Sequence, residues 1–212
     1  MSVIVMIYGQ SGTGKSTSLR NFEPGEVGII NVSGKPMPFK KKLPVLNTDK
    51  YADITNAIVG SKANSIVIDD ATYLMVNEFM RNTKLQGYQK FTDIAKNFFD
   101  LIDAAKNLPD EKIVYFIGHS DMDQNGNEKF KTIGRLLDDK VTLEGEFTIV
   151  LKTVVKDGKY FFQTHNNSMD TVKSPMDMWN EDLIDNDLKA VDKTIREYYG
   201  IAGGKKEEKK TA

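Results

Sequence analysis

Short runs of apolar and β-branched residues recur along the chain, and longer stretches with apolar residues at helical spacing lie between most of them. Apolar runs of strand length are typical of buried parallel strands. Apolar residues three or four positions apart are typical of amphipathic helices. The pattern predicts strands at 3–8, 27–32, 65–69 and 112–117, a short edge strand near 44–46, and helices from Lys15 onward and at 51–59, 72–82, 91–108 and 187–199.

The late strands follow a different pattern. The Asp157-Gly158 pair separates strand-like runs at 147–155 and 159–163, which predicts an antiparallel hairpin. Strands that alternate with helices predict an α/β fold with a mainly parallel central sheet and helices on both faces. We expect one domain over residues 1–200, followed by a charged, disordered tail at 201–212, because GGKKEEKKTA has nothing to bury.

The composition adds limits to this picture. Apolar residues make up 40% and charged residues 28% of the 212 positions, as in an ordinary soluble protein. No apolar run approaches the ~20 residues that span a bilayer, and the first residues lack the basic flank of a secretory signal. We therefore expect a cytoplasmic protein without membrane contact. The absence of cysteine excludes disulfides and thiolate metal sites, and a net charge of −1 argues against a strongly basic nucleic-acid protein.

The segment GQSGTGKST at 9–17 fits the phosphate-binding pattern GxxxxGK[ST] without a mismatch. It follows a predicted strand and opens a predicted helix, so that backbone N–H groups can turn toward phosphates with the helix N-terminus behind them. Lys15 is expected to reach the β- and γ-phosphates and Ser16 to place its hydroxyl on Mg²⁺. The alternative is a glycine-rich turn without chemistry. The expected nucleotide-binding residues are Gly9, Gln10, Ser11, Gly12, Thr13, Gly14, Lys15, Ser16 and Thr17.

Two further strand ends carry polar residues that can complete this site. SIVIDDA delivers Asp69 to the carboxyl end of the sheet, where its carboxylate would hold Mg²⁺ together with Ser16. Asp70 follows directly and either orients the attacking water or caps the next helix. His119, in GHSD after the strand at 112–117, either senses the γ-phosphate or is an ordinary histidine at a strand end. Lys15, Asp70 and His119 are thus the catalytic candidates.

A polar loop at 120–139 carries Lys129, Phe130, Lys131 and Arg135. Lysines that contact phosphates and an aromatic ring that is free to stack on bases suit a nucleic-acid contact, and the alternative is a solvated loop. The lysine run at 40–42 is expected to be a solvated surface.

With these motifs in place, the chain resembles the RecA-like core ATPases of bacteriophages, often described as phage nucleotide-binding proteins, some of which act in single-strand annealing or recombination. The resemblance covers most of the chain: the P-loop at 9–17, SIVIDDA, the strand followed by GHSD, the paired late strands and the ending NDLKAVDKTIREYYG. It implies a RecA-like P-loop fold, ATP and Mg²⁺ as cofactors, and single-stranded DNA as a partner.

The same resemblance implies a homo-oligomer or filament in which a neighbouring subunit completes each nucleotide site with a basic residue. Lys173 in TVKSP is the candidate for that role, with Arg135 or Lys140 as substitutes. A single-strand DNA-binding protein would be a further partner, and a phage-encoded protein would act in the host cell cytoplasm.

One position departs from the pattern of RecA relatives. They place a catalytic glutamate at the end of the strand after the P-loop helix, where this chain has Asn31. An amide cannot act as a carboxylate base, so either Asp70 or Glu78 takes that role or hydrolysis is slow, and we favour Asp70.

The sequence therefore predicts a magnesium-dependent ATPase that couples ATP to single-stranded DNA binding or annealing in recombination or replication. A nucleotide or small-molecule kinase is one alternative, although such sites usually gather several arginines and this chain has four scattered ones. A nucleotide-gated binding module without turnover is another.

Overall fold

A computed structural model of the chain describes residues 1–134 and 136–201. Arg135 and all of the predicted tail except Ile201 therefore lie outside the described residues. The strands are β1 (Val3–Gly9), β2 (Val27–Asn31), β3 (Val45–Asn47), β4 (Ser65–Asp69), β5 (Ile113–Met122), β6 (Glu128–Phe130), β7 (Ile149–Lys156), β8 (Lys159–Gln163) and β9 (Leu183–Asp185). The helices are η1 (Ser16–Asn21), α1 (Tyr51–Gly60), α2 (Thr72–Arg81), α3 (Gln89–Lys106), η2 (Leu137–Val141), η3 (Leu143–Glu146) and α4 (Leu188–Tyr199).

Most of the strands in the described part of the chain form a central sheet in the order β3-β2-β4-β5-β1-β7-β8-β9. Neighbouring strands from β3 to β7 are parallel, and β7, β8 and β9 pair antiparallel, which confirms the predicted mainly parallel sheet with a late hairpin. β3 lies at the sheet edge, as expected of that short strand. β5 lies between β1 and β4, so the carboxyl ends of these three strands meet at one edge of the sheet.

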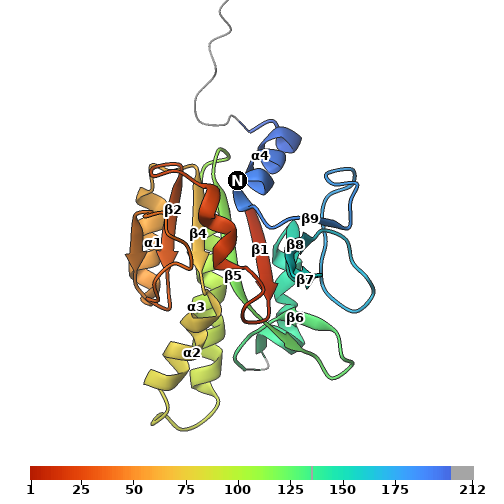
Figure 1. Cartoon of the computed structure of the whole chain (residues 1–212). Coiled ribbons are helices and arrows are strands. Elements are labelled where there is room, and N and C mark those ends of the chain that lie inside the picture. The colour runs from red at the N-terminus through yellow and green to blue at the C-terminus, as the bar shows by residue number, and fades with distance from the viewer. Residues whose placement is uncertain (135, 202–212) are drawn as a thin grey trace, which may run out of the picture.

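Successive side chains along the central strands point alternately into two cores. On β1, Met6 faces one core and Ile7 the other, and both side chains are fully buried. The first core packs under α1, α2 and α3, and the second packs under η1 and α4 (Figure 1). Apolar burial of this kind stabilises the fold by roughly 1.5–3 kcal/mol for each large side chain. Helices thus cover both faces of the sheet, as predicted.

The first helix is shorter and tighter than the sequence pattern suggests. η1 is a 3₁₀ helix of six residues rather than an α-helix. It stops at Asn21 because Pro24 follows shortly, and the residue before a proline avoids helical backbone angles. Arg20 and Asn21 then tie η1 to the start of α4, since Arg20 donates to the carbonyl of Asn186 at 2.6 Å and Asn21 to the carboxylate of Asp187 at 2.8 Å.

The expected polar loop at 120–139 begins as an ordered hairpin. β5 continues past the sheet edge to Met122 and pairs antiparallel with β6. The turn between them is closed by Asp123, whose carboxylate accepts hydrogen bonds from the backbone of Asn125 and Asn127, each at 2.8 Å. No helix among the residues that the structure describes is long and apolar enough to cross a membrane.

The position of Phe130 contradicts the sequence prediction of a ring that is free to stack. The side chain is 1% exposed and belongs to the first core. It packs against Gly118, where an added Cβ would lie 2.5 Å from the ring. The ring is therefore a core residue of the hairpin rather than a base-stacking surface.

Candidate functional site

The glycines of the P-loop are required by its shape and its neighbours. Gly12 and Gly14 have φ angles of +81° and +91°, which residues with a side chain rarely adopt. A Cβ on Gly14 would lie 2.9 Å from the ring of Tyr160 and 3.1 Å from the amide oxygen of Asn186. A Cβ on Gly9 would overlap the hydroxyl of Thr153. The loop therefore keeps a bare backbone at the end of β1, as a phosphate cradle needs.

Lys15 lies inside this loop. Its ammonium donates to the carbonyls of Gly9 at 2.8 Å and Gln10 at 2.7 Å, and the residue is 6% exposed. Burial lowers the pKa of Lys15, against the opposing effect of the Asp70 and Asp69 carboxylates. The cation is thus held where the loop meets the end of the sheet.

Ser16 and Asp69 form a pair of oxygen ligands beside the loop. The hydroxyl of Ser16 donates to Oδ1 of Asp69 at 3.1 Å. Burial raises the pKa of Asp69 to about 6, although the hydrogen bond from Ser16 acts in the opposite direction. A hydroxyl and a carboxylate suit Mg²⁺, which usually takes one or two protein oxygens and completes its shell with phosphates and water.

Asp70 faces the site rather than the helix that follows it. Its φ of +58° turns the chain sharply after β4. The N-cap of α2 is Ala71, and this end of the helix has no side-chain capping hydrogen bond. The capping alternative is therefore not the arrangement found. Burial tends to raise the pKa of Asp70, but contacts with His119, Ser33 and Lys35 outweigh it and hold the pKa below its usual value.

His119 lies on β5 between the two phosphate elements, level with Gly9 in the parallel register. Nε2 of the ring is 3.5 Å from Oδ1 of Asp70. This buried nitrogen has no hydrogen bond within the described residues. The ring also meets Tyr73 edge to face, with 5.5 Å between centroids. An unsatisfied buried nitrogen at this edge suits contact with a ligand oxygen.

Neither Asn31 nor Glu78 supplies the carboxylate base that RecA relatives have at the end of the second strand. Asn31 ends β2 level with Asp69, as expected, but its amide nitrogen and oxygen both bond the turn at 33–35. Glu78 lies on α2 and accepts a hydrogen bond from Asn97 of α3 at 2.7 Å. Glu78 is thus not part of the group at the sheet edge, and Asp70 is the carboxylate that adjoins it.

Lys35 belongs to the site and was not predicted. Its ammonium lies 3.9 Å from Oδ2 of Asp70 and 4.9 Å from the ring centroid of Tyr73. The only sequence signal is the Ser-Gly-Lys turn directly after the end of a predicted strand, which also marks an edge loop of the sheet.

The nucleic-acid candidates are less concentrated than the sequence suggests. Lys129 and Lys131 lie on and just after β6, but the hairpin also carries Asp121, Asp123 and Glu128. Lys131 is 3.9 Å from Asp121. Its backbone N–H donates to the carbonyl of His119 at 2.9 Å, which joins the hairpin to the phosphate edge. The hairpin is thus mixed in charge.

The candidates for a trans-acting cation are Lys173, Lys140 and Arg135. Lys173 is half-buried and pairs with Val150 through two backbone hydrogen bonds of 2.8 and 3.0 Å. Lys140 is exposed, and Arg135 lies outside the described residues.

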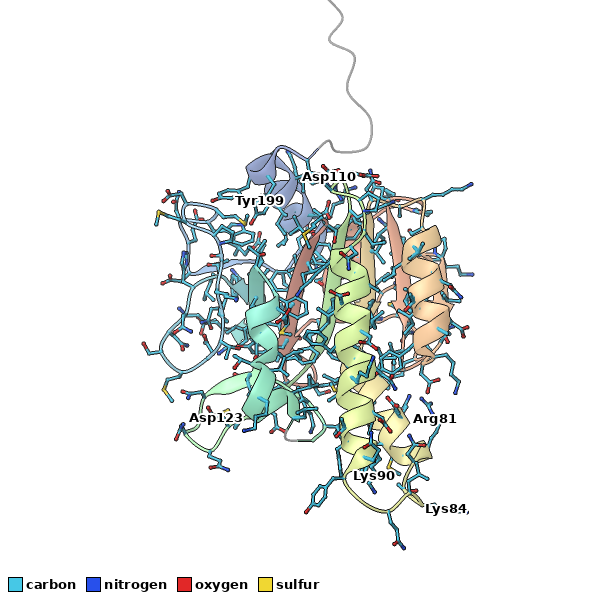
Figure 2. The ribbon with its side chains drawn as sticks, turned by 180° about the vertical axis from the view of Figure 1, so that it is seen from behind. Arg81, Lys84, Lys90, Asp110, Asp123 and Tyr199 are labelled. Atoms are coloured by element: carbon cyan, nitrogen blue, oxygen red, sulfur yellow. The ribbon has the colours of Figure 1, made fainter. Side chains whose placement is uncertain are left out.

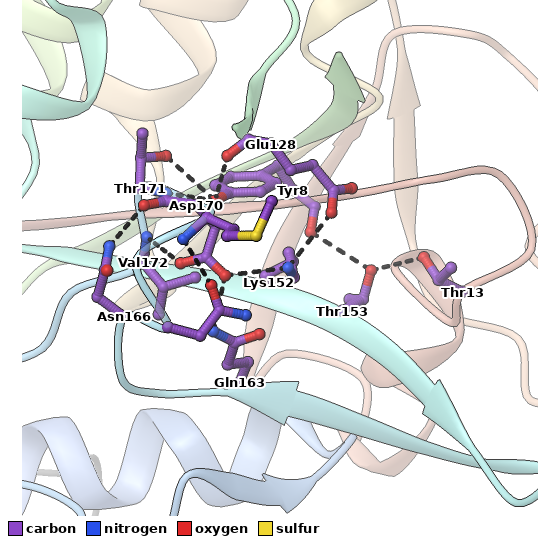
Figure 3. Close-up of polar contacts among 12 residues, drawn as sticks. Tyr8, Thr13, Glu128, Lys152, Thr153, Gln163, Asn166, Asp170, Thr171 and Val172 are labelled. Atoms are coloured by element: carbon purple, nitrogen blue, oxygen red, sulfur yellow. Dashed lines mark hydrogen bonds and ion pairs between the residues drawn. The ribbon is translucent and has the colours of Figure 1, made fainter. Parts of the chain in front are cut away.

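A buried polar network lies beside the P-loop strand (Figure 3). Asp170 is fully buried in its side chain and accepts from Lys152 at 3.0 Å and Gln163 at 2.8 Å. Tyr8, one residue before the P-loop, donates to the carbonyl of Glu128 at 3.2 Å. The network therefore fixes β1, β6, β7 and β8 relative to one another.

The model of the AAA domain family matches residues 1–176 of the sequence. The chain belongs to the AAA domain family. The match covers every element that builds the phosphate edge and ends before β9 and α4. No protein of curated function matches the sequence.

Membership of the AAA domain family agrees with the geometry of the site. The α/β architecture, the glycine cradle and the pair formed by Ser16 and Asp69 are those of a P-loop NTPase, a type of protein that binds nucleotides. The residues present therefore fit a nucleoside triphosphate with Mg²⁺. Family membership confirms the P-loop NTPase part of the sequence-based resemblance, whereas its narrower phage identity stays a prediction.

Proposed function

We propose that this AAA domain protein is a magnesium-dependent ATPase. The observation that carries the proposal is the hydrogen bond between Ser16 and Asp69 beside a buried Lys15, because this arrangement assembles both the metal ligands and the phosphate cation at one strand edge. Asp70 and His119 adjoin the same edge and supply the groups that hydrolysis needs beyond binding.

Each residue has a defined task in this proposal. In hydrolysis the oxygen of a water molecule forms a bond to the γ-phosphorus of magnesium ATP. The bond from that phosphorus to the bridging oxygen breaks, ADP leaves with the electron pair, and the water releases a proton. Lys15 neutralises charge on the phosphates, and Ser16 and Asp69 hold the metal. Asp70, ionised at neutral pH, accepts the proton of water. His119 contacts the γ-phosphate through its unsatisfied nitrogen.

The kinase alternative is weaker because the arginines of the described chain serve the fold. Arg20 bonds backbone carbonyls, Arg81 pairs with Asp49, and Arg196 pairs with Asp192. A binding module without turnover keeps the same phosphate cradle and differs only in whether Asp70 acts as a base.

A narrower part of the proposal concerns the partner. We infer that ATP is coupled to single-stranded DNA binding or annealing of the phage type, in a homo-oligomer or filament to which Lys173 of a neighbour contributes. The sequence resemblance supports this, together with the backbone bond from Lys131 to His119 that links the lysine-bearing hairpin to the phosphate edge.

Phosphate release from magnesium ATP, with and without single-stranded DNA, tests both parts. Lys15→Ala should lower turnover at least ~100-fold, because a preorganised cation on the phosphates contributes on the order of 3 kcal/mol to the transition state. Lys193→Ala is the matched control, since that lysine is exposed on α4 at the other end of the sheet.

Equal turnover and equal ATP affinity in wild type and Lys15→Ala would rule out the P-loop as the site. Release that DNA stimulates, and that Lys15→Ala abolishes, would support the DNA-coupled ATPase. ATP binding without any release would favour the binding module, and a phosphorylated small molecule formed alongside ADP would favour the kinase.

A further inference from the structure

We propose that Lys35 is a second phosphate-contacting catalytic residue, acting in cis on the γ-phosphate, and that Asn31 is the residue that positions it. This inference rests on the proposed ATPase function and names a residue outside the P-loop, outside the pair of Asp69 and Asp70, and outside the strand that carries His119.

The contacts of Lys35 place an exposed cation beside Asp70. Its ammonium reaches Asp70 at 3.9 Å, a long ion pair, and its side chain is 65% exposed. It lies over the ring of Tyr73, which in turn packs on His119. The positive charge of Lys35 also helps to lower the pKa of Lys15, so the two ammonium groups sense one another across the site. Lys35 therefore lies beside Asp70 and within electrostatic reach of Lys15, and it is not locked in a strong pair.

The turn that presents Lys35 depends on an amide at position 31. Nδ2 of Asn31 donates to the carbonyl of Lys35 at 2.7 Å. Oδ1 accepts from the backbone of Gly34 and from the hydroxyl of Ser33, each at 3.1 Å. Gly34 supports the turn with a φ of +68°. A carboxylate has no hydrogen to donate, so aspartate or glutamate at this position could not hold the carbonyl of Lys35.

Charge balance explains why such a cation is useful. The sheet edge has two carboxylates and the ammonium of Lys15, and in the proposed function Asp69 is committed to the metal. Hydrolysis spreads more negative charge over the γ-phosphate oxygens, and a cation nearby stabilises it. The three arginines of the described chain are engaged elsewhere, which leaves Lys35 as the cation beside Asp70.

The geometry also suggests how Lys35 and Asp70 work together. In the structure Lys35 neutralises part of the charge of Asp70. When phosphate oxygens enter, Lys35 moves from the Asp70 carboxylate to them, and Asp70 is left free to accept the proton of water. At the strand end where RecA relatives have a glutamate, the amide of Asn31 thus holds the turn that presents Lys35.

The test compares Lys35→Met, which removes the charge and keeps most of the stem, with Lys40→Met, an exposed lysine of the same connection after β2. Equilibrium binding of a non-hydrolysable ATP analogue and of ADP, both with Mg²⁺, is measured beside turnover. Lys35→Met should weaken the analogue by about 10-fold or more and leave ADP within about 2-fold, because only the γ-phosphate loses a charged contact. Turnover should fall at least as much as analogue affinity, and Lys35→Arg should restore part of both.

Asn31→Asp tests the positioning role. It should lower the ratio of ATP-analogue affinity to ADP affinity in the same direction, with little change in Tm. The double variant Asn31→Asp with Lys35→Met should have the same ratio of analogue affinity to ADP affinity as Lys35→Met alone, because both changes remove the same contact of Lys35 with the γ-phosphate. Faster hydrolysis in Asn31→Asp, or additive losses in the double variant, would overturn that role.

The outcomes separate this inference from the proposed function. A wild-type protein that neither binds the analogue nor releases phosphate would defeat both. The inference alone would fail if the wild-type protein binds and hydrolyses ATP and Lys35→Met has the same ratio of analogue affinity to ADP affinity, and the same turnover, as wild type and Lys40→Met. Lys35 would then be an ordinary surface lysine.

Discussion

The adjacent residues Asp69 and Asp70 experience opposite electrostatic environments. Asp69 is almost fully buried at the end of β4, and this burial raises its pKa to about 6. Asp70 has its pKa held below the usual value by His119, Ser33 and Lys35 despite burial. The folded protein therefore disfavours the charged form of one carboxylate and favours that of its neighbour.

Asp69→Asn should stabilise the nucleotide-free protein at pH 7.5. A carboxyl whose folded pKa exceeds its unfolded value of 3.8 contributes stability at low pH and loses it as pH rises through about 6. The amide avoids that loss, which corresponds to about 1–3 kcal/mol. Unfolding by heat or denaturant should give the variant a higher Tm at pH 7.5, with the gain shrinking toward pH 4.

Asp70→Asn is the control with the opposite sign. Because its pKa is depressed, ionised Asp70 contributes stability above its unfolded pKa, and that contribution is lost as pH falls. This variant should lower Tm at pH 7.5. If both variants shifted Tm in the same direction, the contrast between the two environments would be wrong.

At the scale of elements, the polar network around Asp170 decides how β7, β8 and the segment after β8 meet the P-loop strand. Asp170 accepts from Lys152, Gln163 and the backbone of Val172 with its side chain fully buried. On the other side of β7, Thr153 bonds Thr13 of the P-loop at 2.6 Å. The network thus supports the loop that carries the phosphate chemistry.

Asp170→Ala should destabilise the protein by about 3–5 kcal/mol, because it leaves Lys152 without its closest partner in a mostly buried position. Glu197→Ala removes an exposed i,i+4 pair with Lys193 and should cost below ~0.5 kcal/mol. Denaturant unfolding of both variants measures the difference. Similar small losses in the two proteins would mean that the network adds little to stability.

The elements were largely predictable from the sequence, and their long-range contacts were not. The apolar run of β1 and the glycine spacing at 9–17 are local signals, so the strand and the phosphate loop were found. Whether Phe130 is buried depends on Gly118, twelve residues earlier, and no local pattern records that contact. Lys35 was missed for the same reason, because its partner Asp70 lies on another strand end.

At the scale of the whole molecule, two projections extend beyond the carboxyl edge of the sheet. One is the hairpin of β5 and β6, whose turn carries Asp123, and the other is the tip formed by the connection from α2 to α3, with Lys84, and the first turn of α3, with Lys90 (Figure 2). Asp110 and Tyr199 mark the opposite end.

Lys129→Ala with Lys131→Ala should weaken binding of single-stranded DNA and flatten its dependence on salt. Each lost phosphate contact lowers the slope of log affinity against log salt by about 0.7, so the double variant should lose about 1.4. Lys62→Ala with Lys193→Ala, two exposed lysines at the opposite end, is the control. A salt slope equal to that of wild type would remove the hairpin from the interface.

β5 runs unbroken from Ile113 to Met122, and a Cβ on Gly118 would collide with Phe130 and Thr72, one residue before the last pairing of β5 with β1 at His119. In mechanical terms β5 can be treated as a rigid rod that is held at Gly118. His119 is the next residue after this point, and the hairpin turn lies at the far end of the strand. Because there is no free space around Gly118, we expect any tilt of β5 that brings His119 toward a phosphate to move the hairpin turn as well.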